Sequence, residues 1–139
     1  MKNGIGGRFL VAERIRISTG SSWEPVVGYS RAIRVGNRVE VAGTTAVRDG
    51  KAVGIGDAYA QTVCALEIIE ESLEKVGATL ADVVRTRMFV TDISQWEAIG
   101  KAHGEFFRDI RPVATMVEVR SLIEPELLVE IEAVAMISD

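Results

Sequence analysis

Two stretches of sequence decide the fold: RPVATMVEV at residues 111–119 and LVEIEAVA at residues 128–135. Apolar side chains alternate with other residues along both, with the period of two that is typical of β-strands. Each stretch also carries carboxylates on its polar side. We therefore predict two amphipathic strands near the C-terminus, over Val113–Leu122 and Leu127–Met136.

Earlier parts of the chain predict four more strands and two helices. Asp57 is a good N-cap for a long helix that Gly77 ends. A second helix is expected to begin at SQWE, residues 94–97, which has the pattern of a capping box. Within that helix, Gly100 and Gly104 suggest that another backbone approaches closely. The four remaining strands are predicted over Phe9–Ile17, Arg31–Val35, Arg38–Ala42 and Val83–Thr91.

This order of elements predicts one α+β domain over residues 1–139, with both helices covering one face of the sheet. Turns are expected at Gly36-Asn37 and at Asp49-Gly50. The segment from Ser18 to Pro25 is rich in turn-forming residues and contains a tryptophan. It is a candidate binding loop that leads into Tyr29.

Alternation along the strands divides the sheet into an apolar face and a charged face. Expected beneath the helices are Val39, Val41, Val84, Thr86, Met88, Val90, Val113, Thr115, Val117, Val119, Val129, Ile131, Ala133 and Ala135. Expected on the charged face are Arg38, Glu40, Arg85, Arg87, Glu118, Arg120, Glu130 and Glu132, together with Phe89, Leu122, Val134 and Met136. That face is either washed by solvent, with ion pairs contributing about 0–1 kcal/mol each, or closed against copies of the same chain. The apolar members favour subunit contact.

Composition excludes several classes of protein. The chain has 139 residues, 47% hydrophobic and 26% charged, and a net charge of −4, which does not indicate a nucleic-acid binder. No apolar run is long enough to cross a bilayer and no secretory signal is visible, so we expect a cytosolic protein without a membrane partner. One cysteine, Cys64, and one histidine, His103, leave no zinc pattern, and no metal is expected.

Charge is distributed unevenly along the chain. Residues 1–48 carry a net charge of +5, whereas residues 49–139 carry −9. This difference fits a basic patch for an anionic ligand, association between unlike surfaces, or an ordinary solvated surface. The GIG at residues 54–56 does not indicate a dinucleotide loop, because Tyr59 stands where the third glycine would be.

Four segments, in the right order, resemble the Rid (reactive intermediate deaminase, or YjgF) family. They are GYSRAIRVGN at residues 28–37, VAG at 41–43, TRMFVTDI at 86–93, and the two C-terminal stretches quoted first. The resemblance implies a chorismate-mutase-like α+β fold, with a mixed six-stranded sheet, two helices on one face and a homotrimer. It also implies a small-molecule cleft between subunits and hydrolysis of enamines or imines to keto acids and ammonia without a cofactor.

The resemblance also suggests site residues. Tyr29 and Glu132 match a tyrosine and a last-strand glutamate that position water or substrate in the family. Ala114 stands where the family has the arginine that grips the substrate carboxylate, a contact of roughly 1.5–3 kcal/mol. Met116 stands where a cysteine is common. By alignment of the second helix, Gly100 and His103 stand where an asparagine and a tyrosine often lie.

Each candidate also has a plain structural interpretation. Glu132 is the first choice for a general base or for holding water, or it forms an ion pair with a neighbouring arginine. Arg87 could supply the positive charge missing at Ala114, in competition with Arg85 and Arg120. His103 is either a packed, hydrogen-bonded histidine or a ligand contact. Trp23 and Tyr29 either line the cleft or anchor the loop.

We therefore predict a homotrimer that binds a small molecule between its subunits. Its predicted activity is cofactor-free hydrolysis or deamination of small imine, enamine or carbonyl compounds, with weak action on 2-aminoacrylate-type imines because of Ala114. The alternative is a non-catalytic ligand sensor or interaction protein on the same scaffold. RNA cleavage has been attached to the family, but the acidic balance and the single histidine speak against it.

Overall fold

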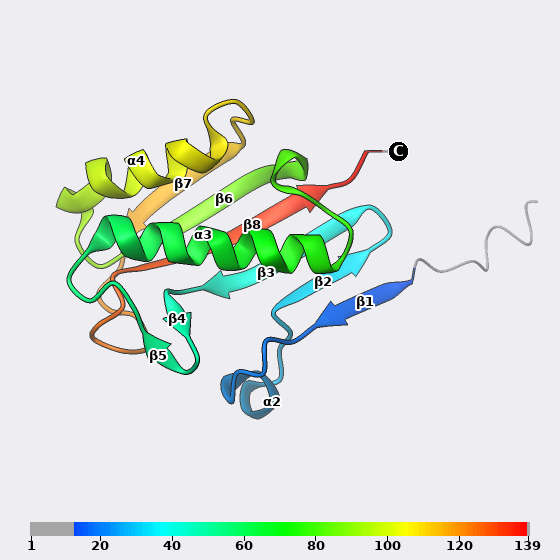
Figure 1. Ribbon diagram of the computed structural model, residues 1–139, viewed down its shortest axis with the longest axis horizontal. Coiled ribbons are helices and arrows are strands. Elements are labelled where there is room, and N and C mark those ends of the chain that lie inside the picture. The colour runs from blue at the N-terminus through cyan, green and yellow to red at the C-terminus, as the bar shows by residue number, and fades with distance from the viewer. Residues whose placement is uncertain (1–12, 139) are drawn as a thin grey trace, which may run out of the picture.

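The computed structural model describes residues 13–138. The chain folds into a mixed six-stranded sheet with two long helices on one face (Figure 1). The strand order is β1-β2-β3-β8-β6-β7, and every neighbouring pair is antiparallel except β6–β7. The strands of this sheet are β1 (Arg14–Ile17), β2 (Ala32–Val35), β3 (Arg38–Thr44), β6 (Val83–Val90), β7 (Val113–Glu118) and β8 (Val129–Met136). The predicted α+β class and mixed sheet are confirmed.

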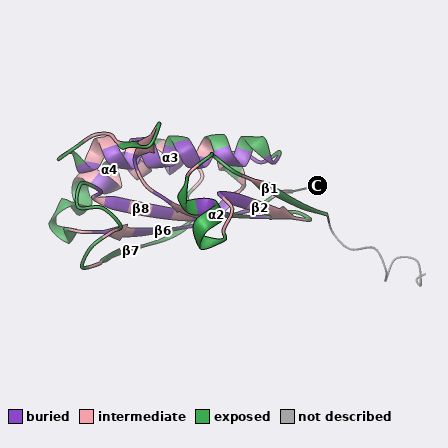
Figure 2. Ribbon diagram, turned by 90° about the horizontal axis from the view of Figure 1, so that it is seen from below, coloured by how far each residue is buried: buried purple, intermediate pink, exposed green. Residues whose placement is uncertain are grey.

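Helices α3 (Ala58–Lys75) and α4 (Trp96–Phe107) lie side by side as a layer over the sheet, as predicted (Figure 2). The Asp57 carboxylate accepts the Ala60 backbone N–H at 3.0 Å, which confirms the N-cap of α3. After the helix, Gly77 has the φ of +85° that suits a glycine. The smaller elements are helix α2 (Trp23–Val27), two 3₁₀ turns, Leu80–Asp82 and Ile93–Gln95, and the strands β4 (Val47–Arg48) and β5 (Lys51–Ala52), which pair as a hairpin.

The core lies between the helices and the sheet. On α3 the fully buried Leu66, Ile69 and Leu73 form the predicted apolar stripe, while the neighbouring glutamates mostly face outwards. Opposite them, the sheet contributes buried side chains such as Val39 and Ile131. Burial of each such aliphatic side chain is worth about 1.5–3 kcal/mol, so this layer accounts for most of the driving force for folding.

Strand β7 faces the opposite way from the prediction. Its register with β6 pairs Thr86 with Ala114 and Met88 with Met116, so those side chains turn towards the helices. Glu118 follows them, and its carboxylate accepts the Ile93 backbone N–H at 2.9 Å. The side chains turned to the open face, contrary to the prediction, are Val113, Thr115 and Val117. Alternation reveals the period of a strand but not which phase is inside, and this edge strand has apolar residues in both phases.

Two further face assignments are wrong. The predicted strand to Leu122 ends at Glu118, so Val119, Arg120 and Leu122 lie beyond it. On β6, a register shift between Val83 and Arg85 buries Val83 and leaves Val84 43% exposed. Such an irregularity adds a residue to one strand and changes which side chains point inwards.

The predicted start of α4 is also wrong. The Asp92 carboxylate accepts both the Ser94 backbone N–H and the Ser94 hydroxyl, and a short 3₁₀ turn, Ile93–Gln95, leads into the helix. Ser94 therefore does not form a capping box with Glu97. A Cβ atom added at Gly100 would meet nothing within 4 Å, and one at Gly104 would meet only the Arg108 guanidinium at 3.9 Å. The expected close approach of another backbone is therefore absent from residues 13–138.

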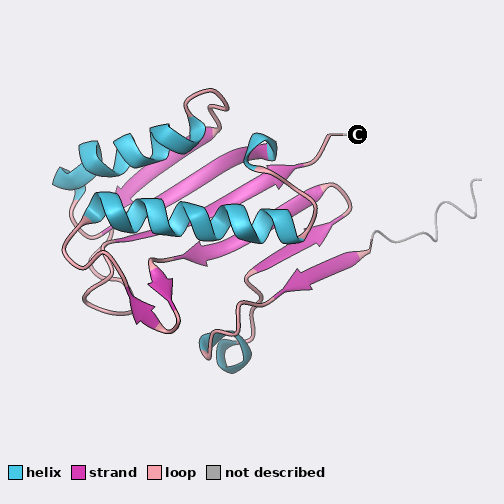
Figure 3. Cartoon of the chain, viewed as in Figure 1, coloured by secondary structure: helices cyan, strands magenta, loops and turns pink. Residues whose placement is uncertain are grey.

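The N-terminal part agrees with the prediction except in one segment. β1 covers the end of the predicted strand, and residues 9–12 lie outside the described part of the chain. The expected loop between Ser18 and Pro25 includes the start of α2, which stands apart from the helical layer (Figure 3). The predicted turn at Asp49-Gly50 joins β4 to β5, with φ of 53° and 75° at its two residues.

Candidate functional site

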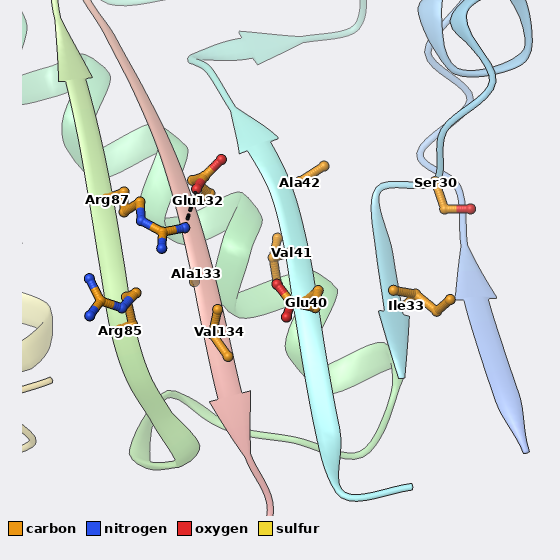
Figure 4. A pocket seen from close by; sticks show the side chains of 10 residues that line it. All are labelled: Ser30, Ile33, Glu40, Val41, Ala42, Arg85, Arg87, Glu132, Ala133 and Val134. Carbon is orange, nitrogen blue, oxygen red and sulfur yellow. Dashed lines mark hydrogen bonds and ion pairs between the residues drawn. The ribbon is translucent and has the colours of Figure 1, made fainter. Parts of the chain in front are cut away.

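A shallow hollow of about 260 Å³ lies on the open face of the sheet (Figure 4). Strands β3, β8 and β6 form its floor, and the segment before β2 forms one side. Its charged side chains come from the face predicted to be charged. The lining residues are Ser30, Ile33, Glu40, Val41, Ala42, Arg85, Arg87, Glu132, Ala133 and Val134.

Glu132 and Arg87 point towards each other across neighbouring strands (Figure 4). Their Oε1 and Nη1 atoms are 3.0 Å apart, and the side chains are 36% and 49% exposed respectively. A pair this exposed contributes about 0–1 kcal/mol to stability. In the single chain, Glu132 therefore forms an ion pair with a neighbouring arginine, which is the structural alternative considered from the sequence. Both side chains are exposed enough to remain accessible to a ligand.

Arg85 lies on the same side of β6, two residues before Arg87. Arg85 forms no ion pair with any residue between 13 and 138, whereas Arg38 pairs with Glu40 at 2.6 Å. The hollow is therefore lined by the Arg87–Glu132 pair, by Glu40, whose partner Arg38 is not a lining residue, and by the Arg85 guanidinium, which no carboxylate among residues 13–138 neutralises.

Glu130 is the carboxylate that reasoning from the sequence underrated. It lies on the open face of β8, is half-buried, and packs against Gly43 in the irregular part of β3. Burial raises the pKa of Glu130, the nearby Arg31 charge lowers it, and the Glu132 charge adds to the rise, with a net upward shift. A carboxyl with a raised pKa is suited to proton transfer, and Glu130 lies on the same face of β8 as Glu132, which lines the hollow. The glycine within a strand was the signal for this irregularity.

A buried arginine connects Glu130 to the N-terminal loop. The Nη1 of Arg31 donates to the Gly43 carbonyl at 2.7 Å and to the Thr44 hydroxyl at 2.8 Å. Its Nε lies 3.9 Å from the carboxylate of Glu24, which belongs to α2. Its guanidinium carbon lies 5.8 Å from the centre of the Tyr29 ring. Neither Arg31 nor Glu24 was a candidate from the sequence.

Glu24 is held in its charged form. Its carboxylate is 3% exposed and accepts the Ser18 hydroxyl at 2.5 Å and the Thr19 hydroxyl at 2.8 Å. Burial raises the pKa of Glu24, but these hydrogen bonds and the Arg31 charge outweigh it, so the net shift is downwards. The loop that presents Tyr29 is therefore fixed by a buried polar cluster.

Tyr29 lines a second hollow, of about 570 Å³, which the segment from Arg16 to Ser30 encloses. Ser30 lines both hollows, so they adjoin. Trp23 lines neither and is 46% exposed on α2. The loop thus brings Tyr29, but not Trp23, to a hollow that adjoins the one lined by Glu132.

The described residues indicate neither a metal site nor a membrane span. No group of three or more histidine, cysteine, aspartate or glutamate side chains between residues 13 and 138 is arranged to hold a metal ion. Over the same residues, no helix has the length and apolar character needed to cross a membrane.

A family model described as endoribonuclease L-PSP matches residues 19–137. The chain belongs to the Rid (YjgF) family. The Streptomyces coelicolor uncharacterized protein SCO2049 is 38% identical over 120 residues, which cover 86% of this chain and 90% of the relative. The 3-aminoacrylate deaminase RutC of Acinetobacter baylyi is 35% identical over 112 residues, which cover 80% and 88%.

Solved structures agree on the fold. Rv2704 from Mycobacterium tuberculosis, a member of the YjgF/YER057c/UK114 family, superimposes with a TM-score of 0.83 at 54% sequence identity. The match covers 90% of this chain and 100% of that chain. The Rid-family fold expected from the sequence is therefore confirmed.

In this Rid-family protein the sheet separates the predicted ligand residues into two groups. His103, Ala114 and Met116 lie on the helix side, whereas Glu132 and Arg87 lie on the open face. Ala114, at the position of the family arginine, is exposed on the edge strand, and Met116 packs against the core. One protomer alone therefore does not bring all the predicted residues into one cleft.

His103 is packed and hydrogen-bonded. Its Nε2 lies 2.8 Å from the hydroxyl of Thr86, and its ring centre lies 4.7 Å from that of Phe107. Burial lowers the pKa of His103, so the ring is neutral near pH 7. Thr86 pairs with Ala114 across β6 and β7, so His103 lies on the side of the sheet to which Ala114 turns. A neutral ring there does not replace the missing positive charge.

Proposed function

We propose that this Rid-family protein is a cytosolic, cofactor-free hydrolase that deaminates small imines or enamines, or hydrolyses related carbonyl compounds. The observation that carries the proposal is the half-buried Glu130 carboxyl, which lies against Gly43 and has a raised pKa. The relative named 3-aminoacrylate deaminase supports the reaction class. An RNA-cleaving role is not proposed, because the net charge is −4 and a nucleic-acid site is expected to be basic.

Imine hydrolysis needs a group that first accepts a proton and then returns one. As water attacks the carbon of a C=N bond, the Glu130 carboxylate takes a proton from that water. The carboxyl gives this proton to the nitrogen of the tetrahedral intermediate and then transfers the proton of the new hydroxyl group to the same nitrogen, so that the C–N bond breaks, the C=O bond forms and ammonia leaves. One imine and one water yield one carbonyl compound and one ammonia, with no oxidant or cofactor. Glu132, two residues along the same face, is proposed to orient the water or the substrate.

The cleft is proposed to form between subunits of a homotrimer. The open face carries apolar side chains with no cover in one protomer, including Val113 at 58% and Val117 at 42% exposure. Subunit contact through this face would shield that surface and place the edge strand of one copy near the hollow of the next. Tyr29, Trp23, Arg87 and Glu132 would then come from one protomer and His103, Ala114 and Met116 from its neighbour. Sedimentation equilibrium showing monomers at micromolar concentration would contradict this arrangement.

The preferred substrate is proposed to lack a carboxylate. Ala114 offers a methyl group where the family arginine binds that carboxylate, and His103 nearby is neutral. A charge-assisted hydrogen bond of about 1.5–3 kcal/mol corresponds to roughly 10- to 100-fold in binding. Efficient action on 2-aminoacrylate-type imines is therefore not expected.

Ammonia release from freshly generated imino acids tests this proposal. A114R is expected to raise kcat/KM for imino acids by about 10- to 100-fold over the natural protein. A114Q, which adds bulk without charge, is the matched control and is expected to give no such gain. Natural protein that hydrolyses imino acids as fast as A114R would refute the substrate assignment. Full activity in E130Q would refute the role of Glu130, and full activity in E132Q that of Glu132.

A non-catalytic ligand sensor is the second candidate. The ion pair between Arg87 and Glu132 favours the sensor, because Arg87 engages the carboxylate that would otherwise orient the water or the substrate. Thermal stabilisation by a small carbonyl compound without any turnover would support the sensor over the hydrolase.

A further inference from the structure

Arg31 holds an unusual position among the charged residues of this protein. It is 7% exposed, yet its Nη1 donates to a carbonyl and a hydroxyl, which a neutral donor could also bond. Its distance of 3.9 Å from Glu24 is at the long limit for an ion pair. A buried charge is costly unless it is compensated, so a cation here calls for a second source of compensation.

Glu130 provides that second source. Its carboxyl packs on the α-carbon side of Gly43, and Arg31 bonds the carbonyl oxygen of the same residue. The guanidinium therefore lies 3.9 Å from the Glu24 carboxylate on the loop, and it also interacts electrostatically with Glu130 on the sheet. Electrostatic attraction by Arg31 partly offsets the effect of burial on Glu130.

The same guanidinium also supports the tyrosine of the candidate site. The Tyr29 ring lies 5.8 Å from the guanidinium carbon, within the range of a cation–π contact. The backbone N–H groups of Gly28 and Tyr29 both donate to the Glu24 carbonyl, at 2.8 and 3.0 Å. Glu24 and Arg31 thus restrain Tyr29 through the backbone and through the ring.

We propose that Arg31 is a positioning residue, whose guanidinium ties the loop bearing Tyr29 to the strand irregularity beneath Glu130. The proposal rests on the proposed function, since it assigns Tyr29 and Glu130 to one cleft. Arg31 does not touch the substrate. Its charge keeps the Glu130 carboxyl ionisable in spite of burial, and its hydrogen bonds fix the loop relative to β3.

The test is a titration of Glu130 in the full-length protein without substrate. Glutamate labelled with ¹³C at the side-chain carboxyl is followed by NMR as the pH is varied, and E130Q assigns the signal. R31Q is expected to move the Glu130 midpoint upwards, and R31K to return it towards the natural value. E24Q, which removes the competing carboxylate behind Arg31, is expected to move it downwards.

The other charge that acts on Glu130 is that of Glu132 on β8, which pairs with Arg87 on β6 and stays in place in these variants. A purely structural role for Arg31 would not produce opposite shifts in R31Q and E24Q. A folded R31Q in which Glu130 titrates as in the natural protein would overturn the proposal. If R31Q does not fold, the E24Q shift decides, and an unchanged midpoint there would overturn it equally.

This test separates the proposal from the proposed function, because the titration needs no turnover. Shifts in the expected directions in a protein that hydrolyses nothing would support Arg31 and refute the hydrolase. Where turnover is present, R31K and R31Q are expected to lower kcat more than they change KM. A change confined to KM would instead show that Arg31 contacts the substrate, contrary to the proposal.

Discussion

Adding one methyl group at Gly43 tests whether the Glu130 carboxyl is the reacting group. In G43A the new Cβ atom would lie 2.9 Å from Cδ and 3.2 Å from Cγ of Glu130, closer than the roughly 3.5–4.0 Å of a favourable carbon contact. It would lie closer still to the carboxylate oxygen Oε2. The Glu130 side chain must therefore rotate away, and its carboxyl leaves the position that it holds in the natural protein.

The effect on stability is expected to be small. An off-rotamer side chain costs about 0.5–1.5 kcal/mol. Gly43 is not among the glycines with positive φ, so alanine fits its backbone and regains about 0.4–1 kcal/mol from the unfolded state. The two terms nearly cancel, and the free energy of unfolding should change by less than about 1 kcal/mol.

The effect on turnover is expected to be large. A displacement of about 1 Å in a reacting group can lower the rate roughly 100-fold. Ammonia release and urea unfolding are therefore measured together for G43A. The matched control is G104A, where the nearest atom to the added Cβ is the Arg108 guanidinium at 3.9 Å. G104A should keep full turnover and gain up to about 1 kcal/mol in stability from improved helix propensity. Full turnover in a folded G43A would refute the assignment of Glu130.

Three further substitutions test the fold around the site. D57A removes the cap that bonds the Ala60 N–H and should lower the free energy of unfolding by about 1 kcal/mol, measured in urea. G77A places a side chain at a φ of +85°, 2.9 Å from the Arg34 Nη1, and should cost about 1–2 kcal/mol, seen as a lower Tm. Burial holds the His103 pKa below 6.5, so the unfolded chain binds the proton more readily and stability should fall as pH drops below about 6.5. H103Q should flatten that slope, and a slope unchanged in H103Q would assign it to other groups.

Most of the architecture was predictable, because it depends on local signals that tertiary contacts reinforce. Helix α3 is specified locally by the Asp57 cap and in the folded protein by burial of the apolar stripe that follows it. The start of α4 was not predictable in the same way. Asp92 and Ser94 can both cap a helix, and the choice depends on the strand that delivers the chain to this point.

The candidate site was only partly predictable. Alternation placed Arg87 and Glu132 on one face correctly, because β6 and β8 are central strands with one clearly apolar side. It failed on β7, where the edge position leaves both sides partly exposed. It also could not distinguish Glu130 from Glu132. Their environments differ because of Gly43 and Arg31, which are distant in sequence and meet β8 only in the folded sheet.

The central place of β8 has a consequence for how the chain is synthesised. Strands β1 to β3 lie on one side of β8, β6 and β7 lie on the other, and β8 is the last of these strands to leave the ribosome. Until it emerges, the inner edges of β3 and β6 expose unpaired backbone groups that invite wrong pairing. Until β8 emerges, the nascent chain therefore contains two separate half-sheets, and its demand for chaperones should be greatest just before that strand appears.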